Sequence, residues 1–155
     1  MMRVELSAGA FSPEAEMAAF SLSNMIGAVA SFVGYCRDEG GVVRQLELEH
    51  YPGFSEARVK ELVRAVAEKH SLIDVLVVHR VGAIPAGDPI VLVAASSAHR
   101  APALAAVAEL MDDLKTEAPI WKKEVGARGE SWIEPTRQDY LAAAGRRQAH
   151  GKQAS

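Results

Sequence analysis

The stretch IVLVAASSAHRAPALAAVAELMDDLKTEAPIWKKEV, residues 90–125, encodes the central strand and the main helix of the expected fold. Its first six residues form an unbroken apolar run, which is typical of a strand covered on both faces. Pro102 is tolerated only in the first turn of a helix, so a helix should begin between His99 and Ala101 and run to about Thr116. We therefore expect a buried strand and a long helix joined by a short polar turn.

Beyond this helix, Pro119 forces the chain to bend before another strand begins. Residues 120–125 and 131–134 predict two strands joined by a short loop. On the first of these strands Lys122 and Glu124 share one face, because side chains alternate along a strand. The helix itself carries apolar residues that we expect to point inward: Leu104, Val107, Met111 and Leu114.

The remaining sequence predicts shorter elements on both sides of this stretch. We expect strands at residues 3–6, 27–36, 42–51 and 73–81, and helices at residues 13–20, 55–70 and 139–147. Asp38-Glu39-Gly40-Gly41 predicts a turn that makes a hairpin of the second and third strands. Ser12 and Ser55 are the expected caps of the first two helices.

The order of these elements is mixed, with hairpins near both ends and alternating strands and helices between them. This order favours an α+β fold with antiparallel sheets and two main packing helices over a doubly wound parallel sheet. A chain of 155 residues suits a single domain. We expect that domain to span residues 1–144, with residues 145–155 forming a disordered tail.

Composition and charge argue against several classes of function. The chain is 49% hydrophobic with a formal charge of -3, so no basic excess points to nucleic acid. Its single cysteine, Cys36, permits neither an intrachain disulfide nor a cysteine zinc cluster, and it suits a reducing cytosol. The N-terminus lacks the apolar core of a signal peptide, and the longest apolar run falls short of the roughly 20 residues that span a bilayer. We expect a cytoplasmic protein without a membrane segment or a metal.

Five cations gather around the main helix: His99, Arg100, Lys115, Lys122 and Lys123. A helix N-terminus attracts anions through its free N–H groups, and Arg100 can add a bidentate contact to phosphate or carboxylate. Simpler explanations also exist, because helix starts often carry exposed polar residues, Lys115 suits a helix C-terminus, and most lysines are solvated. On the residues alone, an anion site and a set of structural cations both remain open.

Other polar residues have two interpretations each. Arg37 directly follows a strand, where it is either a binding residue or a solvated loop residue. Cys36 is either a nucleophile or a small buried hydrophobic residue, and His79 alternates with apolar neighbours, which predicts a structural role. Strand alternation separates Glu49 from His50 and disfavours a metal cluster there.

Four blocks of sequence carry a family resemblance. They are GAVASFVGYCR at residues 27–37, LELEHYP at 46–52, VHRVGAIPAGDPIVLVAASSAHRAP at 78–102 and MDDLKTEAPIWKKE at 111–124. Their wording, order and spacing are similar to those of the large, catalytic subunits of molybdopterin synthase, the MoaE family. The resemblance covers roughly residues 3–140 and implies an α+β fold with a hammerhead-like part.

The resemblance implies a sulfurtransferase of molybdenum cofactor biosynthesis that has no cofactor of its own. Members of the family convert cyclic pyranopterin monophosphate into molybdopterin by installing a dithiolene. The sulfur comes from the C-terminal Gly-Gly thiocarboxylate of a small ubiquitin-like carrier subunit. The implied assembly is a heterotetramer, in which a homodimer of the large subunit holds one carrier at each end.

By position, the resemblance assigns two catalytic residues, Lys115 and Lys122. It assigns these residues to substrate binding: Arg37, His99, Arg100, Lys123, Glu124 and Arg137. Two other functions remain open: a non-catalytic module that binds a phosphorylated ligand through the same His-Arg helix start, and a scaffold for a ubiquitin-like carrier that performs no chemistry. Only the synthase requires both lysines close together in one pocket.

Overall fold

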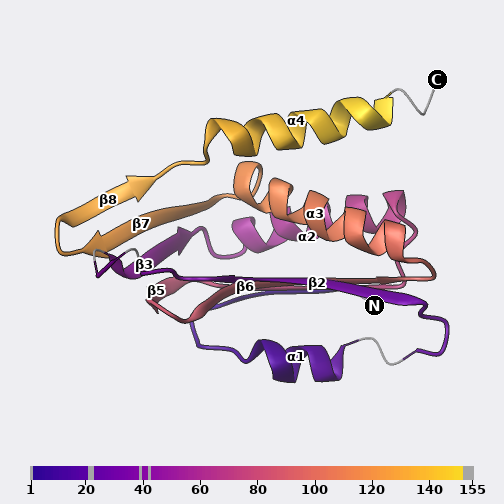
Figure 1. Cartoon of the computed structure of the whole chain (residues 1–155), viewed down its shortest axis with the longest axis horizontal. Helices are drawn as coiled ribbons and strands as arrows, with labels where there is room; N and C mark the ends of the chain where they lie inside the picture. Colours follow the sequence, from indigo (N-terminus) through magenta and orange to yellow (C-terminus); the bar gives the residue numbers. More distant parts are fainter. Residues whose placement is uncertain (1, 21–22, 39, 42, 152–155) are drawn as a thin grey trace.

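Two four-stranded sheets and four helices make up the part of the chain that the computed structural model describes, residues 2–20, 23–38, 40–41 and 43–151 (Figure 1). The strands are β1 (Met2–Ser7), β2 (Ala28–Tyr35), β3 (Val43–His50), β4 (Asp74–Arg80), β5 (Gly82–Pro85), β6 (Pro89–Ser97), β7 (Ile120–Gly126) and β8 (Gly129–Ile133). The helices are α1 (Pro13–Ala19), α2 (Phe54–Lys69), α3 (Arg100–Thr116) and α4 (Arg137–Gly151). None of these helices combines the length and the apolar character that a bilayer span requires. The expected α+β class is confirmed.

The first sheet has the strand order β1-β4-β6-β2, with α2 and α3 on one face and α1 on the other (Figure 1). β6 is the doubly covered strand that the apolar run predicted, and every residue from Ile90 to Ser97 is buried. Its Val93 packs into the core under α2 and α3, whereas Leu92 packs into the core on the side of α1. Alternation along one strand therefore supplies both cores.

One pairing in the first sheet differs from the expected antiparallel arrangement. β1 runs parallel to β4, with Met2 opposite Val75 and Ser7 opposite Arg80, while β6 pairs antiparallel with both β4 and β2. A parallel pair needs a long connection, and the chain between β1 and β4 includes two helices and two strands. Local turn signals carry no information about a pairing across such a distance.

The expected hairpin between the second and third predicted strands does not form. β2 pairs with β6 in the first sheet, whereas β3 pairs with β5 and β7 in the second sheet, which has the order β5-β3-β7-β8. The Cys36 N–H donates to the Asp88 carbonyl and its own carbonyl accepts from Gly87, which holds the end of β2 beside the turn after β5. β2 therefore pairs with the edge of β6 that β4 leaves open, and β3 belongs to the second sheet. Residues 39 and 42 of the predicted turn and strand lie outside the described residues.

α3 packs on the first sheet through small residues as well as large ones. Its buried residues are Ala103, Ala106, Val107, Leu110 and Leu114. The inward position predicted for Leu104 is wrong, because this side chain is 61% exposed. Alanines have small side chains, so the helix face that carries them can lie close to the sheet. The buried face of α3 is therefore rotated from the face that the large apolar residues predict.

Ser55 is buried and does not cap α2, whose N-cap is Gly53. Its hydroxyl accepts a hydrogen bond from the Tyr51 N–H at 2.9 Å and donates one to the Pro119 carbonyl at 2.8 Å. One buried hydroxyl therefore ties the start of α2 to the bend between α3 and β7. This link fixes the position of the bend that joins α3 to β7. It therefore fixes the position of Lys122 on β7.

α4 lies beside α3 on the outer side of the molecule (Figure 1). Arg146 pairs with Asp112 of α3 and anchors the helix. The helix extends from Arg137 to Gly151, so it includes residues 145–151 of the expected tail. The alanine run at residues 142–144 and the packing against α3 favour the helix. Residues 152–155 of that predicted tail lie outside the described residues.

At Gly27 the backbone leaves no room for a side chain. The Gly27 N–H donates to the Ser97 carbonyl at 3.0 Å, and a Cβ added there would lie 1.9 Å from the Ala98 carbonyl oxygen. This close approach fixes the turn from β6 into α3, and therefore the place of His99.

We expect Gly27→Ala to lower the free energy of unfolding by roughly 3 kcal/mol, because its methyl group would overlap the Ala98 carbonyl. Gly145→Ala is the matched control, since nothing lies within 4 Å of a Cβ added at this helical position. It should raise stability by about 0.5–1 kcal/mol through helix propensity. Urea unfolding measures both values, and wild-type stability of G27A would contradict the close approach.

Candidate functional site

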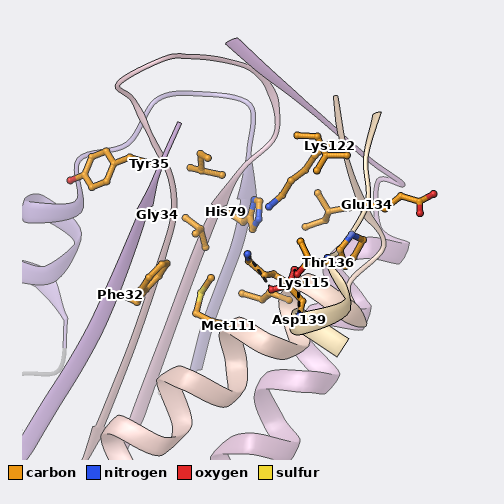
Figure 2. Close-up of a pocket in the computed structure, with 16 residues that line it drawn as sticks. Phe32, Gly34, Tyr35, His79, Met111, Lys115, Lys122, Glu134, Thr136 and Asp139 are labelled. Atoms are coloured by element: carbon orange, nitrogen blue, oxygen red, sulfur yellow. Dashed lines mark hydrogen bonds and ion pairs between the residues drawn. The ribbon is translucent and has the colours of Figure 1, made fainter. Parts of the chain in front are cut away.

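A pocket of about 290 Å³ opens where the end of α3, the start of β7 and the start of α4 meet the first sheet (Figure 2). Side chains with acid–base chemistry line it from four different elements, among them His79 of β4, Lys115 of α3, Lys122 of β7 and Asp139 of α4. Apolar and aromatic side chains form much of the remaining wall: Phe32, Tyr35, Ile90, Val91, Met111, Leu114 and Ile133. We call this cavity the lysine pocket.

The two lysines assigned to catalysis, Lys115 and Lys122, are brought together in this pocket. Lys115 is in the last turn of α3, and Lys122 is the third residue of β7, opposite Leu48 of β3. The bend at Pro119 turns β7 back beside the end of the helix. Figure 2 shows the amino groups of both lysines directed toward the centre of the pocket.

Lys122 is half-buried, whereas Lys115 is exposed. Burial lowers the pKa of Lys122 below its usual value, and the positive charge of Lys115 lowers it further. The carboxylate of Asp139 opposes this effect and limits the shift. Lys122 therefore releases a proton more readily than a solvated lysine does.

Asp139 holds Lys115 from the first turn of α4, with 3.6 Å between the Lys115 Nζ and a carboxylate oxygen. The Thr136 N–H donates to this carboxylate at 2.8 Å and the Thr136 hydroxyl donates to it at 2.9 Å, while the Asp139 N–H donates back to the hydroxyl at 3.2 Å. This reciprocal arrangement is a capping box. Partial burial favours the neutral acid, but the hydrogen bonds from Thr136 and the charge of Lys115 outweigh it and lower the pKa of Asp139.

His79 lines the pocket, although the sequence pattern predicted only a structural role for it. It is 5% exposed, and its Nδ1 lies 2.9 Å from the Arg80 carbonyl oxygen. Burial lowers its pKa to about 4, with Lys122 and His50 adding to the effect and the bond to Arg80 opposing it. The imidazole is therefore uncharged at neutral pH. Its one signal in the sequence is a histidine inside an apolar strand, which burial explains equally well.

Positive charge exceeds negative charge inside the lysine pocket. Figure 2 shows the Glu134 carboxylate turned away from the other labelled side chains, which leaves Asp139 as the acid facing the lysines among the described lining residues. Such a balance suits an anionic ligand. Within the described residues, no group of three His, Cys, Asp or Glu side chains could hold a metal ion.

Lys123 and Glu124 do not line the lysine pocket. Lys123 forms ion pairs with Glu47 at 3.1 Å and Glu130 at 3.2 Å, and its Nζ lies 5.5 Å from the centroid of the Trp132 ring. Hydrogen bonds to the two carboxylates raise the pKa of Lys123 above its usual value. In this chain Lys123 therefore stabilises the second sheet, on the opposite face of β7 from Lys122.

The four remaining predicted binding residues also do not line the pocket within a single chain. His99 and Arg100 are exposed at the N-terminal end of α3, about 24 Å of helix rise from Lys115. Arg37 is exposed two residues after Tyr35, which is part of the pocket wall, so it lies at the same end of β2. Arg137 is exposed in the first turn of α4, the turn that carries Asp139.

Comparisons of sequence and comparisons of fold find the same group of known proteins. A profile of a family described as MoaE protein matches residues 6–117. The molybdopterin synthase catalytic subunit of Caulobacter vibrioides is 47% identical over 139 residues, which cover 89% of this chain and 93% of the relative. The molybdopterin biosynthesis MoaE protein from Burkholderia ambifaria superposes with a TM-score of 0.77 at 41% identity, covering 94% and 99% of the two chains. The complex of subunits 1 and 2 of molybdopterin-converting factor from Helicobacter pylori superposes with a TM-score of 0.72 at 20% identity, covering 84% of this chain and 89% of that one, a similarity of fold alone.

The pKa of His79 predicts a specific acid sensitivity. Because the folded value is about 4 and the ordinary value is 6.5, the unfolded chain binds the proton first, and stability is lost as the pH falls from 6.5 toward 4. The contribution of His79 to this loss is up to about 3 kcal/mol. Urea unfolding at pH 7 and pH 4.5 should show a smaller pH-dependent loss in His79→Gln than in the wild type. Equal losses in both chains would mean that the imidazole is not held neutral.

Proposed function

The chain belongs to the MoaE family, the catalytic subunits of molybdopterin synthase, and from this membership we propose how its lysine pocket acts. The chain is a sulfurtransferase of molybdenum cofactor biosynthesis. It moves sulfur from the C-terminal thiocarboxylate of a small ubiquitin-like carrier subunit to cyclic pyranopterin monophosphate and forms the dithiolene of molybdopterin. The observation that carries the site proposal is the convergence of Lys115 and Lys122 in one pocket.

Electrostatics explain why this reaction needs cations. The thiocarboxylate and the phosphate-bearing pterin are both anions. Two like unit charges roughly 4 Å apart repel by about 4 kcal/mol at an effective dielectric constant of about 20. Two lysines from different elements offset this repulsion at the point where the reactants meet.

We assign different roles to the two lysines because their surroundings differ. Once the carrier's sulfur has bonded to the pterin, water must cleave the carrier's own C–S bond and leave the carrier with a carboxylate. Lys115, held by Asp139 at 3.6 Å, lies beside that carbonyl and stabilises the negative charge that develops on its oxygen as water attacks. Lys122, whose pKa burial and Lys115 lower, lies near the pterin side chain and exchanges a proton as each carbon–sulfur bond forms. The nucleophile is the carrier's sulfur. Cys36 is buried, and burial raises the pKa of its thiol, which suits a structural residue.

A second depression supports a separate entry for the carrier's tail. It has a volume of about 440 Å³ and shares Lys115, Ile120 and Ile133 with the lysine pocket. Trp121 and Tyr140 line it and are 43% and 52% exposed. Exposed aromatic residues suit a protein interface, and a Gly-Gly tail has no side chains to obstruct a narrow path. We propose that the tail reaches Lys115 through this depression.

His99 and Arg100 take part in this reaction only if a second copy of the chain supplies them. They are exposed, and nearly the whole length of α3 separates them from Lys115 of the same chain. In a homodimer, the pair from one protomer can face the lysine pocket of its partner and hold the phosphate group. Arg37 and Arg137 are then further binding residues at the pocket's rim, while Lys123 and Glu124 shape β7 from outside the pocket.

We also propose that residues 1–144 act as one catalytic domain and that the protein works in the cytoplasm. The buried free thiol of Cys36 suits a reducing compartment.

Lys115→Ala should reduce dithiolene formation by roughly 10²–10³-fold, because the developing negative charge loses its partner. The measurement mixes the purified chain with thiocarboxylated carrier and cyclic pyranopterin monophosphate and detects molybdopterin as its fluorescent oxidised derivative. Lys60→Ala is the control, since Lys60 pairs with Glu56 on α2 and lines neither depression, so its loss should leave the rate unchanged. Size-exclusion chromatography and urea unfolding verify that both variants fold, and a K115A chain with most of its activity would contradict the assignment.

Mixing two inactive variants tests the shared site. Arg100→Ala and Lys115→Ala homodimers should each be nearly inactive, but a mixed dimer contains one complete site and one site that lacks both residues. After random exchange of subunits at equal amounts, about a quarter of wild-type activity should return. Native mass spectrometry verifies that the subunits have exchanged. If they have and no activity returns, His99 and Arg100 do not belong to the partner's site.

A further inference from the structure

His79 is a buried imidazole on the wall of the lysine pocket, and neither lysine role described above involves it. It lies in β4 between Val78 and Arg80, and a carbonyl group, which can only accept a hydrogen bond, lies 2.9 Å from its Nδ1. Nδ1 therefore carries the proton, and Nε2 keeps a lone pair. The ring is 5% exposed but is part of the pocket surface, which makes this lone pair available to a ligand or a neighbouring side chain.

The charged groups around His79 come from several elements. Lys122 of β7, Lys115 of α3 and Asp139 of α4 share the pocket with it, His50 of β3 also acts on it, and Glu134 turns its carboxylate away. Figure 2 shows the ring and the two lysine amino groups directed toward one another. A protonated imidazole would repel both lysines, so the neutral form is the one that this arrangement admits.

We propose that His79 is a positioning residue for Lys122: its Nε2 accepts a hydrogen bond from the Lys122 amino group, directly or through one water molecule. This inference rests on the proposed function. When Lys122 is uncharged, its amino group donates one N–H to His79. This hydrogen bond orients the lone pair of the Lys122 nitrogen toward the substrate proton that Lys122 must accept.

The chemistry of an imidazole suits this task better than the alternatives. A carboxylate at the same place would attract the ammonium form and hold Lys122 protonated. An apolar side chain would leave an N–H group of the half-buried amine without a partner. A neutral imidazole orients the lysine and adds no charge to the pocket.

Two substitutions separate the nitrogens of His79. Asparagine can place an amide N–H near the position of Nδ1 and keep the bond to the Arg80 carbonyl, but it has nothing at the position of Nε2. Glutamine extends an amide oxygen toward the position of Nε2. We therefore expect kcat to fall roughly 10-fold in His79→Asn with KM changed less than about 2-fold, and we expect His79→Gln to retain most of the wild-type kcat.

A second measurement reads Lys122 without any turnover. Acetylation of Lys122 by an amine-selective reagent, followed by mass spectrometry across a pH series, reports the pKa of this residue in the substrate-free chain. An acceptor stabilises the ammonium form more than the amine, so the pKa of Lys122 should be lower in H79N than in H79Q or the wild type. Lys60 of α2, which pairs with Glu56 outside the lysine pocket, serves as an internal control whose acetylation should not differ among the three chains.

The outcomes distinguish this inference from the function on which it rests. A wild-type chain that forms no molybdopterin overturns the proposed function, while the titration of Lys122 still tests the contact with His79. If the wild type is active, unchanged kcat and unchanged Lys122 titration in H79N overturn the inference. Equal loss of kcat in H79N and H79Q, together with equal loss of stability, also overturns it and makes the histidine a packing residue.

Discussion

The hydrogen bond from the buried Ser55 hydroxyl to the Pro119 carbonyl holds the bend on which the site depends. Pro119 stops α3 from continuing, and the bond to the start of α2 fixes the direction in which β7 leaves. Without a fixed bend, a lysine at the end of a helix and a lysine on the strand that follows would have no defined separation. With it, Lys115 and Lys122 share one pocket whose walls come from both sheets and from α4.

Positive charge exceeds negative charge inside that pocket, and hydrogen bonds and ion pairs near each charged residue maintain this excess. Asp139 is committed to the capping box of α4 through Thr136, so it meets Lys115 at 3.6 Å without filling the pocket. Burial and the charge of Lys115 lower the pKa of Lys122. Lys123, the next residue, has two carboxylate partners and a raised pKa. Two adjacent lysines thus acquire opposite properties because a strand turns them to opposite faces.

The sequence predicted the features that depend on local rules. The apolar run of β6, the start of α3 near Pro102 and the bend at Pro119 follow from residue type and position alone, and family resemblance singled out the two lysines. Strand partners such as β2 with β6 and β1 with β4 were not predictable, because no local pattern encodes pairing between distant segments. His79 and Asp139 were missed for the same reason: each enters the site only through packing against elements remote in the sequence.

Direct titration of Lys122 tests the central claim, which is that Lys115 and Lys122 lie close enough for the charge of one to change the pKa of the other. Labelling lysines with ¹³C at Cε and following the Lys122 resonance with pH by NMR gives its pKa in the wild type and in Lys115→Ala. A pKa below that of a solvated lysine in the wild type, rising when the charge of Lys115 is removed, is the expected result. An ordinary pKa that does not respond to the substitution would mean that the two amino groups do not share a pocket.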